Sequence, residues 1–515
     1  MRTTRRSSCI RGVLLAGPMA GLGLCLLVAC ARSSAPKVIT DGIVIDDVTL
    51  ISPERQIPLP HAVVVIRDGR IADIGTDLVA GPAATRIDGQ GRFLVPGLID
   101  SHVHVGSMGP LDDMAISSHP ELLHEYRSQL PRAYLAFGFT ALVDLDLRED
   151  TLRWFNATPV HPDLYHSGRG VHIVGGYGAQ RIPSDAAAAN AANLVYEAGQ
   201  ARQWPATLDP RDYTPARAVD RVVRAGGICV KTFVEPGFGG AAQWPVPRPE
   251  TLATLRAETR RRGLVLVVHA NGVDSWHAAV DAHADVIAHG LWHWPGDRLG
   301  TTPPPGAREV IRAAARAGIG VQPTLQAVYG DQSVFDRSVL EDPRLMEALP
   351  RALVAYLKSD EAQASWRAVA DEYRQAIAKF FGPASPDPAA AMATGSARAT
   401  ATLRIMLAEK VKLLFGTDTP SNEGLGNPPG LNGRLELARW FEAGVPLSSI
   451  LRAATLDNAV AFGLSADLGT IEVGKRADLL LLHDNPLETI AAYDAIDLIF
   501  LNGDRFTRAS LLPRY

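Results

Sequence analysis

The stretch Leu94–Val105, which reads LVPGLIDSHVHV, places two histidines one residue apart at the end of an apolar run. Side chains two positions apart on a β-strand point to the same side of it. If the run is a strand, His102 and His104 can therefore face one metal ion at its carboxyl end. Such a pair is more often a structural or surface pair than a metal site, so the remaining sequence has to decide.

The composition is that of a folded protein with no preference for polyanions. The chain has 515 residues, of which 47% are hydrophobic and 21% charged, and its formal net charge is -4. This length allows one large domain with additions, or about two to three domains. Because no long run of Lys or Arg occurs, we expect no nucleic-acid partner.

The N-terminus has the pattern of a secretory signal. A basic start is followed by the apolar run Val13–Ala29, then by Cys30 and a polar segment. Leu27–Cys30 resembles the lipobox of bacterial lipoproteins, in which the cysteine becomes the lipid-bearing first residue after cleavage. We therefore predict a lipoprotein signal peptide over residues 1–30 and a lipid anchor at Cys30 on the periplasmic side of a membrane. Ala31 favours the outer membrane, and an ordinary signal peptide is the alternative.

The cysteines do not provide a disulfide framework. Cys9, Cys25 and Cys30 lie in the predicted signal or at its end, and Cys229 is the fourth cysteine. If Cys30 carries lipid, Cys229 has no partner, although exported proteins often form disulfides. We therefore expect the stability of the fold to come from a large hydrophobic core.

Two kinds of pattern divide the rest of the chain. Residues 31–95 and 464–515 contain short β-branched runs separated by turn sequences such as Asp-Gly, which predicts hairpins. We interpret them as the N-terminal and C-terminal parts of one small β-sandwich domain. Residues 96–463 instead alternate apolar runs with helical stretches rich in Ala, Arg and Glu, which is typical of an α/β fold.

The central segment fits a TIM-like (β/α)8 barrel, because about eight strand–helix units can be placed in it. The candidate strands are residues 98–101, 140–144, 170–174, 228–233, 264–269, 286–289, 320–322 and 411–416. A doubly wound parallel sheet would give the same alternation, so the number of strands does not choose between these two folds.

A long insertion, residues 325–408, separates the last two candidate strands. It contains two amphipathic helical segments, EALPRALVAYLKS and SWRAVADEYRQAIAKFFG. The insertion could be a structural addition on the outside of the barrel. It could also be a lid, since strand-to-helix connections open on the catalytic face of such barrels.

Residues that can bind metal ions recur where the candidate strands end. LVLVVHA contains His269, DVIAHG contains His289, and KLLFGTD ends in Asp418. GICVKTFV places Lys231 between apolar neighbours, and an unpaired lysine is seldom buried without a reason. Each residue alone could be structural, for example as a helix cap. Together they favour a functional site, because catalytic groups of a barrel come from the ends of several strands.

With these motifs in this order, the chain resembles the amidohydrolase superfamily of metal-dependent hydrolases. The matching stretches are VPGLIDSHVHV, the lysine of VKTF, the two single histidines, FGTDTP, and the tail ILRAATLDNAVAFGLSADLGTIEVGKRADLLLL. The resemblance covers nearly the whole chain after the signal and points to the binuclear, imidazolonepropionase- or prolidase-like branch. It implies a barrel with a small β-sandwich domain that is built from both chain ends.

The resemblance also implies two divalent metal ions and their ligands. One ion would be bound by His102, His104 and Asp418, and the other by His269 and His289. In binuclear members the lysine that matches Lys231 is carboxylated by CO2 and bridges the two ions. Imidazole and carboxylate ligands suit zinc, so we expect zinc together with a carbamate on Lys231.

The reaction implied by this resemblance is hydrolysis of a C–N amide bond. Two metal ions ~3.5–4 Å apart share a water and lower its pKa towards ~7, so that a metal-bridged hydroxide attacks a carbonyl. Asp418 would take the proton and hand it to the leaving nitrogen, serving as general base and then as general acid. We expect a small-molecule amide substrate such as a dipeptide, an N-acyl amino acid or a cyclic amide.

The chain departs from its relatives where substrate is expected. Peptidase-like relatives often carry Gly-Gly-His-Gly after the third strand, and here Tyr177 takes the place of that histidine. Trp292 and His293 follow the histidine of the sixth strand. We predict that Tyr177, Trp292 and His293 contact the substrate, which favours an aromatic or apolar group. Trp292 and His293 could instead pack beneath a lid.

Two other functions are compatible with the sequence. One is a mononuclear, deaminase-type member of the same superfamily, in which Lys231 takes no part. The other is a non-enzymatic envelope lipoprotein that retains the fold. The presence of all six expected ligands favours an enzyme, and the absence of a Gly-x-Ser-x-Gly motif disfavours a serine hydrolase.

Overall fold

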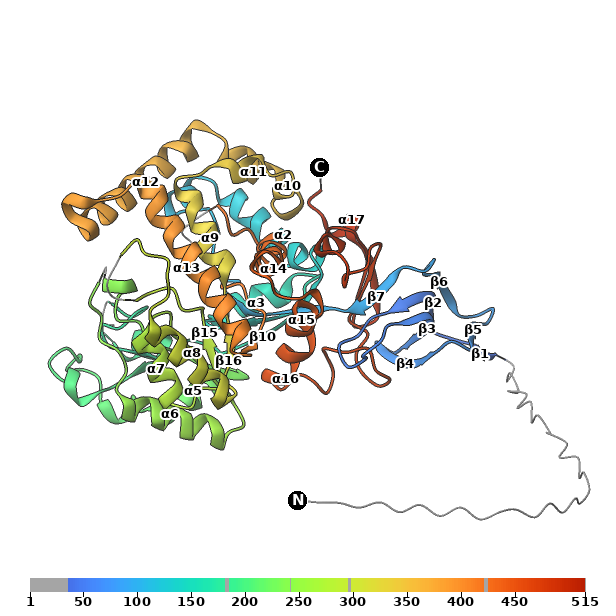
Figure 1. Ribbon diagram of the computed structural model, residues 1–515, viewed down its shortest axis with the longest axis horizontal. Coiled ribbons are helices and arrows are strands. Elements are labelled where there is room, and N and C mark those ends of the chain that lie inside the picture. The colour runs from blue at the N-terminus through green and yellow to red at the C-terminus, as the bar shows by residue number, and fades with distance from the viewer. Residues whose placement is uncertain (1–35, 181–184, 241, 295–297, 421–424, 515) are drawn as a thin grey trace, which may run out of the picture.

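The computed structural model describes residues 36–514, except for 181–184, 241, 295–297 and 421–424. A large body of strands and helices is joined to a smaller sheet at its side (Figure 1). The predicted signal over residues 1–30 and the predicted lipid-bearing Cys30 lie outside the described residues. Within the described ranges, no helix is both long and apolar enough to span a bilayer.

The smaller sheet is built from both ends of the chain. Its strands follow the order β20-β19-β18-β7-β2-β3-β4, and β6 also pairs with β2. They are β2 (Ile43–Leu50), β3 (Leu59–Arg67), β4 (Arg70–Gly75), β6 (Thr85–Asp88), β7 (Phe93–Pro96), β18 (Leu479–Leu482), β19 (Ile496–Leu501) and β20 (Asp504–Thr507). In the antiparallel pair of β18 with β7, Leu481 lies opposite Leu94, so the C-terminal strands complete the N-terminal sheet.

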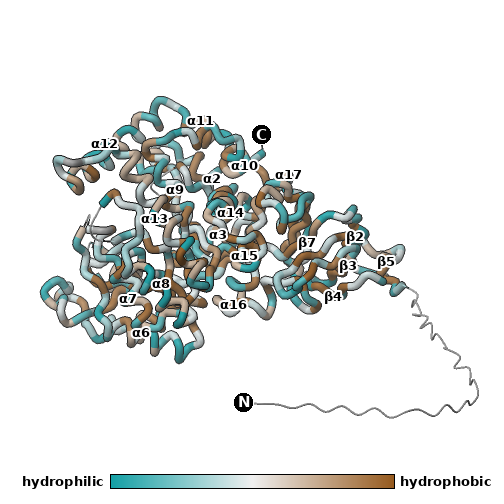
Figure 2. The backbone as a smooth tube through the Cα atoms, in the orientation of Figure 1, coloured by the Kyte–Doolittle hydropathy of each residue, from teal (hydrophilic) through white to brown (hydrophobic). Residues whose placement is uncertain are grey.

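Side chains on one face of this sheet form an apolar cluster of its own. Val64, Leu94, Leu481 and Phe500 belong to one cluster of buried apolar residues. Figure 2 shows hydrophobic stretches along the strands β3, β4 and β7. A short parallel pair, β1 (Lys37–Ile39) with β5 (Leu78–Ala80), covers a second apolar cluster on the same domain.

The eight parallel strands of the body close into a barrel, which confirms the TIM-like barrel predicted from the sequence. They are β8 (Leu98–Val103), β9 (Phe139–Asp144), β10 (Asp163–His166), β13 (Cys229–Phe233), β14 (Val265–His269), β15 (Val286–Ala288), β16 (Gly320–Gln322) and β17 (Lys412–Leu413). The bridge Val171–Thr232 joins the third strand region to the fourth, and the bridge Val103–Thr419 joins the eighth to the first.

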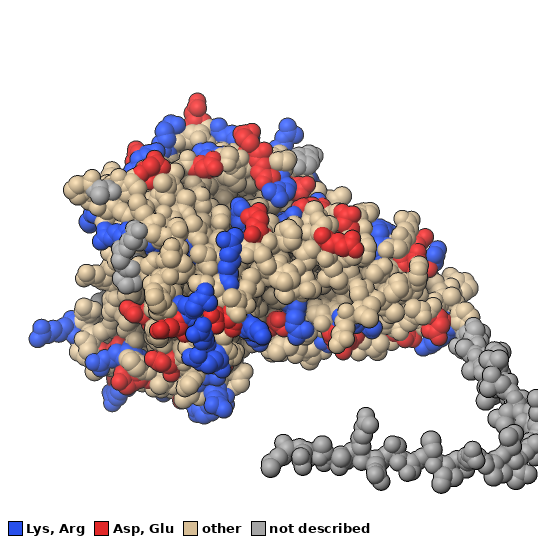
Figure 3. Space-filling model, viewed as in Figure 1, with Lys and Arg blue, Asp and Glu red and all other residues tan. Residues whose placement is uncertain are grey.

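Helices surround this barrel. The longer ones are α2 (Pro120–Ala136), α3 (Glu149–Ala157), α5 (Pro215–Arg224), α6 (Pro249–Arg261), α7 (Val273–Asp281), α8 (Pro305–Ala317) and α14 (Leu431–Ala443). Shorter ones are α1 (Asp113–Ser118), α4 (Ala186–Ala191), α15 (Leu447–Arg452), α16 (Asn458–Ala461) and α17 (Arg508–Leu511). Figure 3 shows both signs of charge scattered over the outer face in view, in keeping with the small net charge.

The third strand is not where the sequence pattern put it. The barrel strand is β10 (Asp163–His166). The predicted segment 170–174 reaches the barrel only through the bridge of Val171 with Thr232, and its strand β11 (His172–Ile173) pairs with β12 (Leu194–Val195) in a separate sheet. The residues of β10 are mostly half-buried, so they lack the continuous apolar run that marks a buried parallel strand. The eighth strand is also shorter than predicted, since β17 covers only Lys412–Leu413 of residues 411–416.

The insertion forms a helical layer on one side of the barrel (Figure 1). Its helices are α9 (Leu325–Asp331), α10 (Leu345–Ala348), α11 (Arg351–Leu357), α12 (Asp360–Phe381) and α13 (Pro388–Ala408). The helices α9 and α13 pack on each other and on α14 and α8, while α10 and α11 pack on α2. In contrast, α12 buries only two alanines, Ala362 and Ala370.

Polar contacts hold both ends of α12 to connections at the carboxyl ends of barrel strands. Ser365 donates its hydroxyl to Asp112, which follows the first strand, at 2.5 Å. At the other end, Arg298 of the sixth-strand connection donates to the carbonyl oxygen of Phe380, and its guanidinium lies 4.1 Å from the centroid of that ring. The helix α12 therefore spans between two connections on the catalytic face of the barrel.

Gly97 joins the small sheet to the barrel and leaves no room for a side chain. Its N–H donates to the carbonyl oxygen of Asp478 at 2.8 Å, and a Cβ placed on it would lie 2.2 Å from Oγ1 of Thr140. Real Cβ atoms do not approach so closely, because the interior is close-packed. The connection between the two domains therefore requires glycine at this position.

We expect Gly97→Ala to lower the free energy of unfolding by about 2 kcal/mol, because overpacking forces neighbouring atoms apart. In a Thr140→Ala background the same change should cost clearly less, since the two closest atoms are removed. Urea unfolding of the four proteins measures this coupling. Gly306→Ala is the matched control, since its Cβ would meet its nearest neighbour at 3.8 Å. Equal costs in both backgrounds would contradict the packing explanation.

Candidate metal centre

The six predicted ligands come from five segments of chain that converge at one end of the barrel. His102 lies in β8, Lys231 in β13 and His269 at the end of β14, while His104, His289 and Asp418 follow their strands. The ring centroid of His102 lies 5.3 Å from that of His104 and 5.1 Å from that of His289. The rings of His289 and His269 are 4.4 Å apart. The structure thus brings all four histidines together, as the parallel strand order requires.

Asp418 is the common partner of three of these histidines. Its Oδ1 lies 2.9 Å from Nε2 of His102 and 3.0 Å from Nε2 of His104. Its Oδ2 lies 3.6 Å from Nδ1 of His289. His102, His104 and Asp418 can each offer one ligand atom within 4.8 Å of the others, which makes them a candidate metal site.

Lys231 lies at the same centre with its amine buried. Only 1% of the residue is exposed, and Nζ lies 3.4 Å from Nε2 of His102. Burial lowers the pKa of the lysine to about 8. Among the residues that the structure describes, no carboxylate lies within ion-pair distance of Nζ. A buried amine in this setting loses its proton more easily than an exposed lysine.

Two of the ligand positions and one neighbour have backbone angles that favour glycine. The φ angles are 84° at His289, 61° at Asp418 and 48° at Thr324. Such left-handed conformations are uncommon for residues other than glycine and cluster at functional sites. Here they turn the chain directly after a strand, so that the side chains face the barrel axis rather than continuing the strand pattern.

Glu235 and Thr324 orient two of the histidines, and sequence reasoning missed both. Oε2 of the buried Glu235 lies 3.3 Å from Nε2 of His269, while Oε1 accepts the N–H groups of Gly237 and Phe238. Oγ1 of Thr324 lies 3.0 Å from Nδ1 of His289. Metal-binding histidines usually engage their second ring nitrogen in this way, which fixes the orientation of the ring. The sequence contained one signal for Glu235, since a glutamate four residues after Lys231 and among apolar residues is expected to have a buried partner.

The protonation states suit metal binding. Burial and the neighbouring Lys231 lower the pKa of His102 to about 3, and burial holds the pKa of His289 well below its usual range. Burial alone would raise the pKa of Asp418, but His289 and His102 keep it well below its ordinary value. The imidazoles of His102 and His289 are therefore neutral and the carboxylate is charged at neutral pH, which are the forms that bind metals.

A divalent metal ion fits this donor set. Neutral imidazole nitrogens and a carboxylate oxygen are ligands that zinc accepts. Nδ1 of His102 is buried and has no hydrogen-bond partner among the described residues, so this side chain lacks the partners that a purely structural histidine would have. The clustering of three imidazoles around one carboxylate is otherwise costly, because each polar group loses its water.

Aromatic rings form a wall beside His269 and His289. The ring of Tyr177 lies 5.1 Å from that of His269, 5.3 Å from Phe238 and 5.4 Å from Trp244. The ring of Trp292 lies 5.8 Å from His289, and His293 lies 6.0 Å from Phe238. The three predicted substrate-binding residues, Tyr177, Trp292 and His293, therefore all border the centre. Phe238 and Trp244 were not predicted, because they lie in an irregular loop after β13.

The insertion contacts this wall through Arg398 of α13. Its Nε donates to the carbonyl oxygen of Gly300 at 2.7 Å, and its Nη1 donates to that of Trp292 at 3.4 Å. Its guanidinium lies 4.3 Å from the ring centroid of Trp294. The insertion is therefore connected to the loop that carries part of the candidate site, and is more than an addition to the outside of the barrel.

The family comparison covers most of the chain. Residues 93–505 match the model described as the amidohydrolase family. Among curated proteins, the adenine deaminase of Rubrobacter xylanophilus is 40% identical over 83 residues, which are 16% of this chain and 13% of that protein. The imidazolonepropionase of Mycolicibacterium smegmatis is 49% identical over 47 residues, which are 9% of this chain and 12% of that protein. The matches thus span about an eighth of the length of these relatives.

Solved structures share the whole fold at low sequence identity. An amidohydrolase matches with a TM-score of 0.62 and 21% identity, covering 90% of this chain and 98% of its own. A Xaa-Pro dipeptidase with bound methionine in the active site matches with a TM-score of 0.60 and 19% identity, and the match covers 90% of this chain and 99% of that protein. The A. niger ochratoxinase matches with a TM-score of 0.60 and 20% identity, and the match covers 90% of this chain and 95% of that protein. These similarities establish the barrel with its small sheet domain.

The partial burial of His293 predicts a pH dependence of stability. Burial lowers the pKa of His293 to about 4, whereas the unfolded side chain titrates near ~6.5. The unfolded state therefore binds the extra proton between these values, and stability is lost as the pH falls through this window. In metal-free protein, we expect the wild type to lose about 2 kcal/mol more than His293→Asn between pH 7 and pH 5.

Urea unfolding at the two pH values measures this difference. His277→Asn, which removes an exposed imidazole on α7, is the matched control and should follow the wild type. An identical loss of stability in the wild type and in His293→Asn would show that His293 is not buried in its neutral form.

Proposed function

Because this chain belongs to the amidohydrolase family, we propose that it is a metal-dependent hydrolase that cleaves a C–N amide bond of a small molecule. The observation that carries this proposal is the convergence of three histidines on the carboxylate of Asp418, with the buried Lys231 beside His102 and with His269 beside His289. The proposed substrate is a dipeptide, an N-acyl amino acid or a cyclic amide. The family and its hydrolase neighbours support the coarser statement of an enzyme that acts on C–N bonds.

In this proposal the residues divide into two ligand groups. His102, His104 and Asp418 hold one divalent ion, and His269 with His289 holds a second. The hydrogen bond of Glu235 leaves Nδ1 of His269 for a metal, and that of Thr324 leaves Nε2 of His289. Bound divalent ions, with zinc proposed, would supply an activated water and polarise the carbonyl of the substrate.

Lys231 contributes an anionic oxygen ligand if its amine is carboxylated. The six predicted ligands include one carboxylate for two dications, and Lys231 is the member of this set that is neither an imidazole nor a carboxylate. The lone pair of Nζ forms a bond to the carbon of CO2, one proton leaves the nitrogen, and a carbamate results. The lowered pKa of about 8 favours this step, because only the neutral amine can attack CO2.

Asp418 moves the proton of the reaction. Oδ1 is shared between His102 and His104, whereas Oδ2 has the longer contact of 3.6 Å to His289. We assign Oδ2 as the atom that accepts a proton from the attacking water and delivers it to the leaving nitrogen. The contacts to three imidazoles keep this carboxylate in one orientation during both transfers.

A mononuclear deaminase is the second candidate, because one specific observation favours it. Among the His, Cys, Asp and Glu side chains that the structure describes, His102, His104 and Asp418 form a group of three whose ligand atoms all lie within 4.8 Å, which is sufficient to hold one ion. Short segments of adenine deaminases are also similar to this chain. Metal analysis separates the candidates, since the deaminase requires one ion per chain and the amide hydrolase two.

We expect the metal-loaded chain to hydrolyse members of a dipeptide and N-acyl amino acid library. Lys231→Ala should lose about one bound ion and lower kcat by roughly 1000-fold, because the bridging charge is removed. Formate or acetate should restore part of both, since a small carboxylate can occupy the place of the carbamate.

The control is Lys379→Ala, which removes an exposed lysine on α12 and should behave like the wild type. Metal content comes from elemental analysis and turnover from amine release. Wild-type metal content and turnover in Lys231→Ala would refute the carbamate. A metal-loaded protein that hydrolyses no member of the library would refute the amide hydrolase and support the non-enzymatic lipoprotein.

We also propose that the protein is exported and anchored to a membrane, in the outer membrane on its periplasmic side, through lipid on Cys30. The support is the signal-like sequence over residues 1–30 and the polar segment that follows it. The substitution Cys30→Ser should move the protein from the membrane to the soluble fraction or leave an uncleaved precursor. Membrane fractionation measures this change. Mature Cys30→Ser protein that stays in the membrane would contradict the anchor.

A further inference from the structure

A cavity lies on the catalytic face, between the connection that follows β8 and the inserted helices. It has a volume of about 340 Å³ and includes Met108, Leu111, Tyr356, Trp366, Leu425 and Arg337 in its lining. Met108 comes four residues after His104 and Leu425 seven residues after Asp418, so two walls belong to connections that carry proposed ligands. This volume is within the range of small-molecule sites.

Arg337 supplies a positive charge inside this mainly apolar lining. Its guanidinium carbon lies 4.9 Å from the ring centroid of Trp366. Its Nε and the Nε1 of Trp366 are both buried, and neither has a hydrogen-bond partner among the described residues. Burial lowers the pKa of this guanidinium, and no nearby charge contributes to the shift. Two buried donors without acceptors are costly to leave unpaired, which points to a missing acceptor.

The acidic residues at the rim do not fill this role. Asp112 accepts the N–H of Ala115 with Oδ1 and the hydroxyl of Ser365 with Oδ2. Asp113 is exposed, and no ion pair joins it to Arg337 within the described part of the chain. Arginine binds carboxylates strongly, because its planar N–H groups match the two oxygens. The acceptor that suits this cavity is therefore a carboxylate attached to an apolar group.

We propose that this cavity binds the free carboxylate end of the substrate and that Arg337 pairs with that carboxylate. The inference rests on the proposed function and narrows it to N-acyl amino acids and dipeptides. The connections after strands one, seven and eight form the cavity, whereas the aromatic wall of Tyr177 and Trp292 comes from the connections after strands three to six. In this proposal the metal centre lies between these two sets of connections, so that the two ends of the substrate meet different surfaces.

The helix α12 closes this subsite. It carries Trp366, and Ser365 beside it is bound to Asp112 of the opposite wall. The insertion therefore completes the place where the carboxylate is recognised, and a substrate without a carboxylate loses this contact.

The test compares N-acetylphenylalanine with its carboxamide as substrates of the metal-loaded full chain. The wild type should prefer the acid. Arg337→Met should raise KM for the acid by about 10- to 100-fold, the usual value of a charge-assisted hydrogen bond, and leave kcat and the amide kinetics little changed. Arg337→Lys should recover part of the preference, because it keeps the charge without the planar fork.

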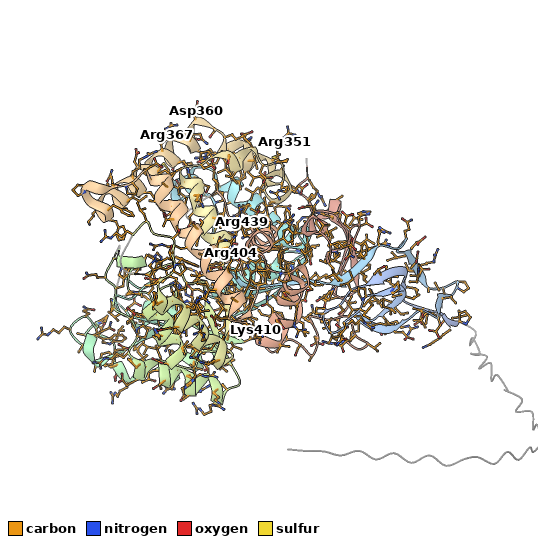
Figure 4. The ribbon with its side chains drawn as sticks, in the orientation of Figure 1. Arg351, Asp360, Arg367, Arg404, Lys410 and Arg439 are labelled. Carbon is orange, nitrogen blue, oxygen red and sulfur yellow. The ribbon has the colours of Figure 1, made fainter. Side chains whose placement is uncertain are left out.

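Arg367→Met is the matched control. Arg367 is exposed on α12, next to Trp366, and Figure 4 labels it at the outer edge of the insertion. Equal acid and amide kinetics in the wild type, or an unchanged acid preference in Arg337→Met, would overturn the proposal. If Arg337→Met does not fold, Trp366→Phe tests the same cavity. This substitution removes the second buried donor, so it should raise KM for the acid and leave KM for the amide unchanged.

A binding measurement separates this proposal from the proposed function. Calorimetry of N-acetylphenylalanine with the full chain requires no turnover. Binding that Arg337→Met abolishes, in a protein that hydrolyses no amide, would support the carboxylate site and refute the hydrolase. Turnover of the acid with an affinity that is independent of Arg337 would support the hydrolase and refute the carboxylate site.

Discussion

The carboxylate of Asp418 is the interaction on which the rest of the site depends. It contacts two histidines of the first strand and one of the sixth, so a single negative charge fixes side chains from distant parts of the sequence. Without that charge, three neutral imidazoles and a lysine would lie buried with few partners, which is costly. The positive φ of Asp418 shows that the backbone adopts an unfavourable angle to place this side chain.

Barrel closure positions this carboxylate. The buried Asp100 accepts the hydroxyl of Thr417 at 2.7 Å and the N–H groups of Thr417 and His102, so it joins the first strand to the eighth just before the ligands. Asn458 donates to the carbonyl oxygens of Ile99 and Phe415 and ties the same two strands from outside. The ligands on these strands therefore keep their separation even though β17 itself is short.

The inserted helices make the catalytic face unsymmetrical. Arg398 of α13 holds the loop with Trp292, while α12 reaches from the first connection to the sixth. Aromatic rings border one side of the centre, and in our proposal Arg337 provides a cation on another. A molecule that places an amide over the centre would thus meet an apolar surface at one end and a positive charge at the other. This asymmetry is the basis on which the chain can select one orientation of a substrate.

The sequence alone determined the parts of the molecule that follow from strand periodicity. Parallel strands bring their carboxyl ends to one edge, so the strand pattern is sufficient to group His102, His104, Lys231, His269, His289 and Asp418. The half-buried third strand gave no such pattern and was misplaced. Glu235, Thr324, Phe238, Trp244 and Arg337 emerged only from the tertiary structure, because they lie in irregular connections. Local sequence sets which residues a loop contains, whereas packing against distant segments decides where their side chains point.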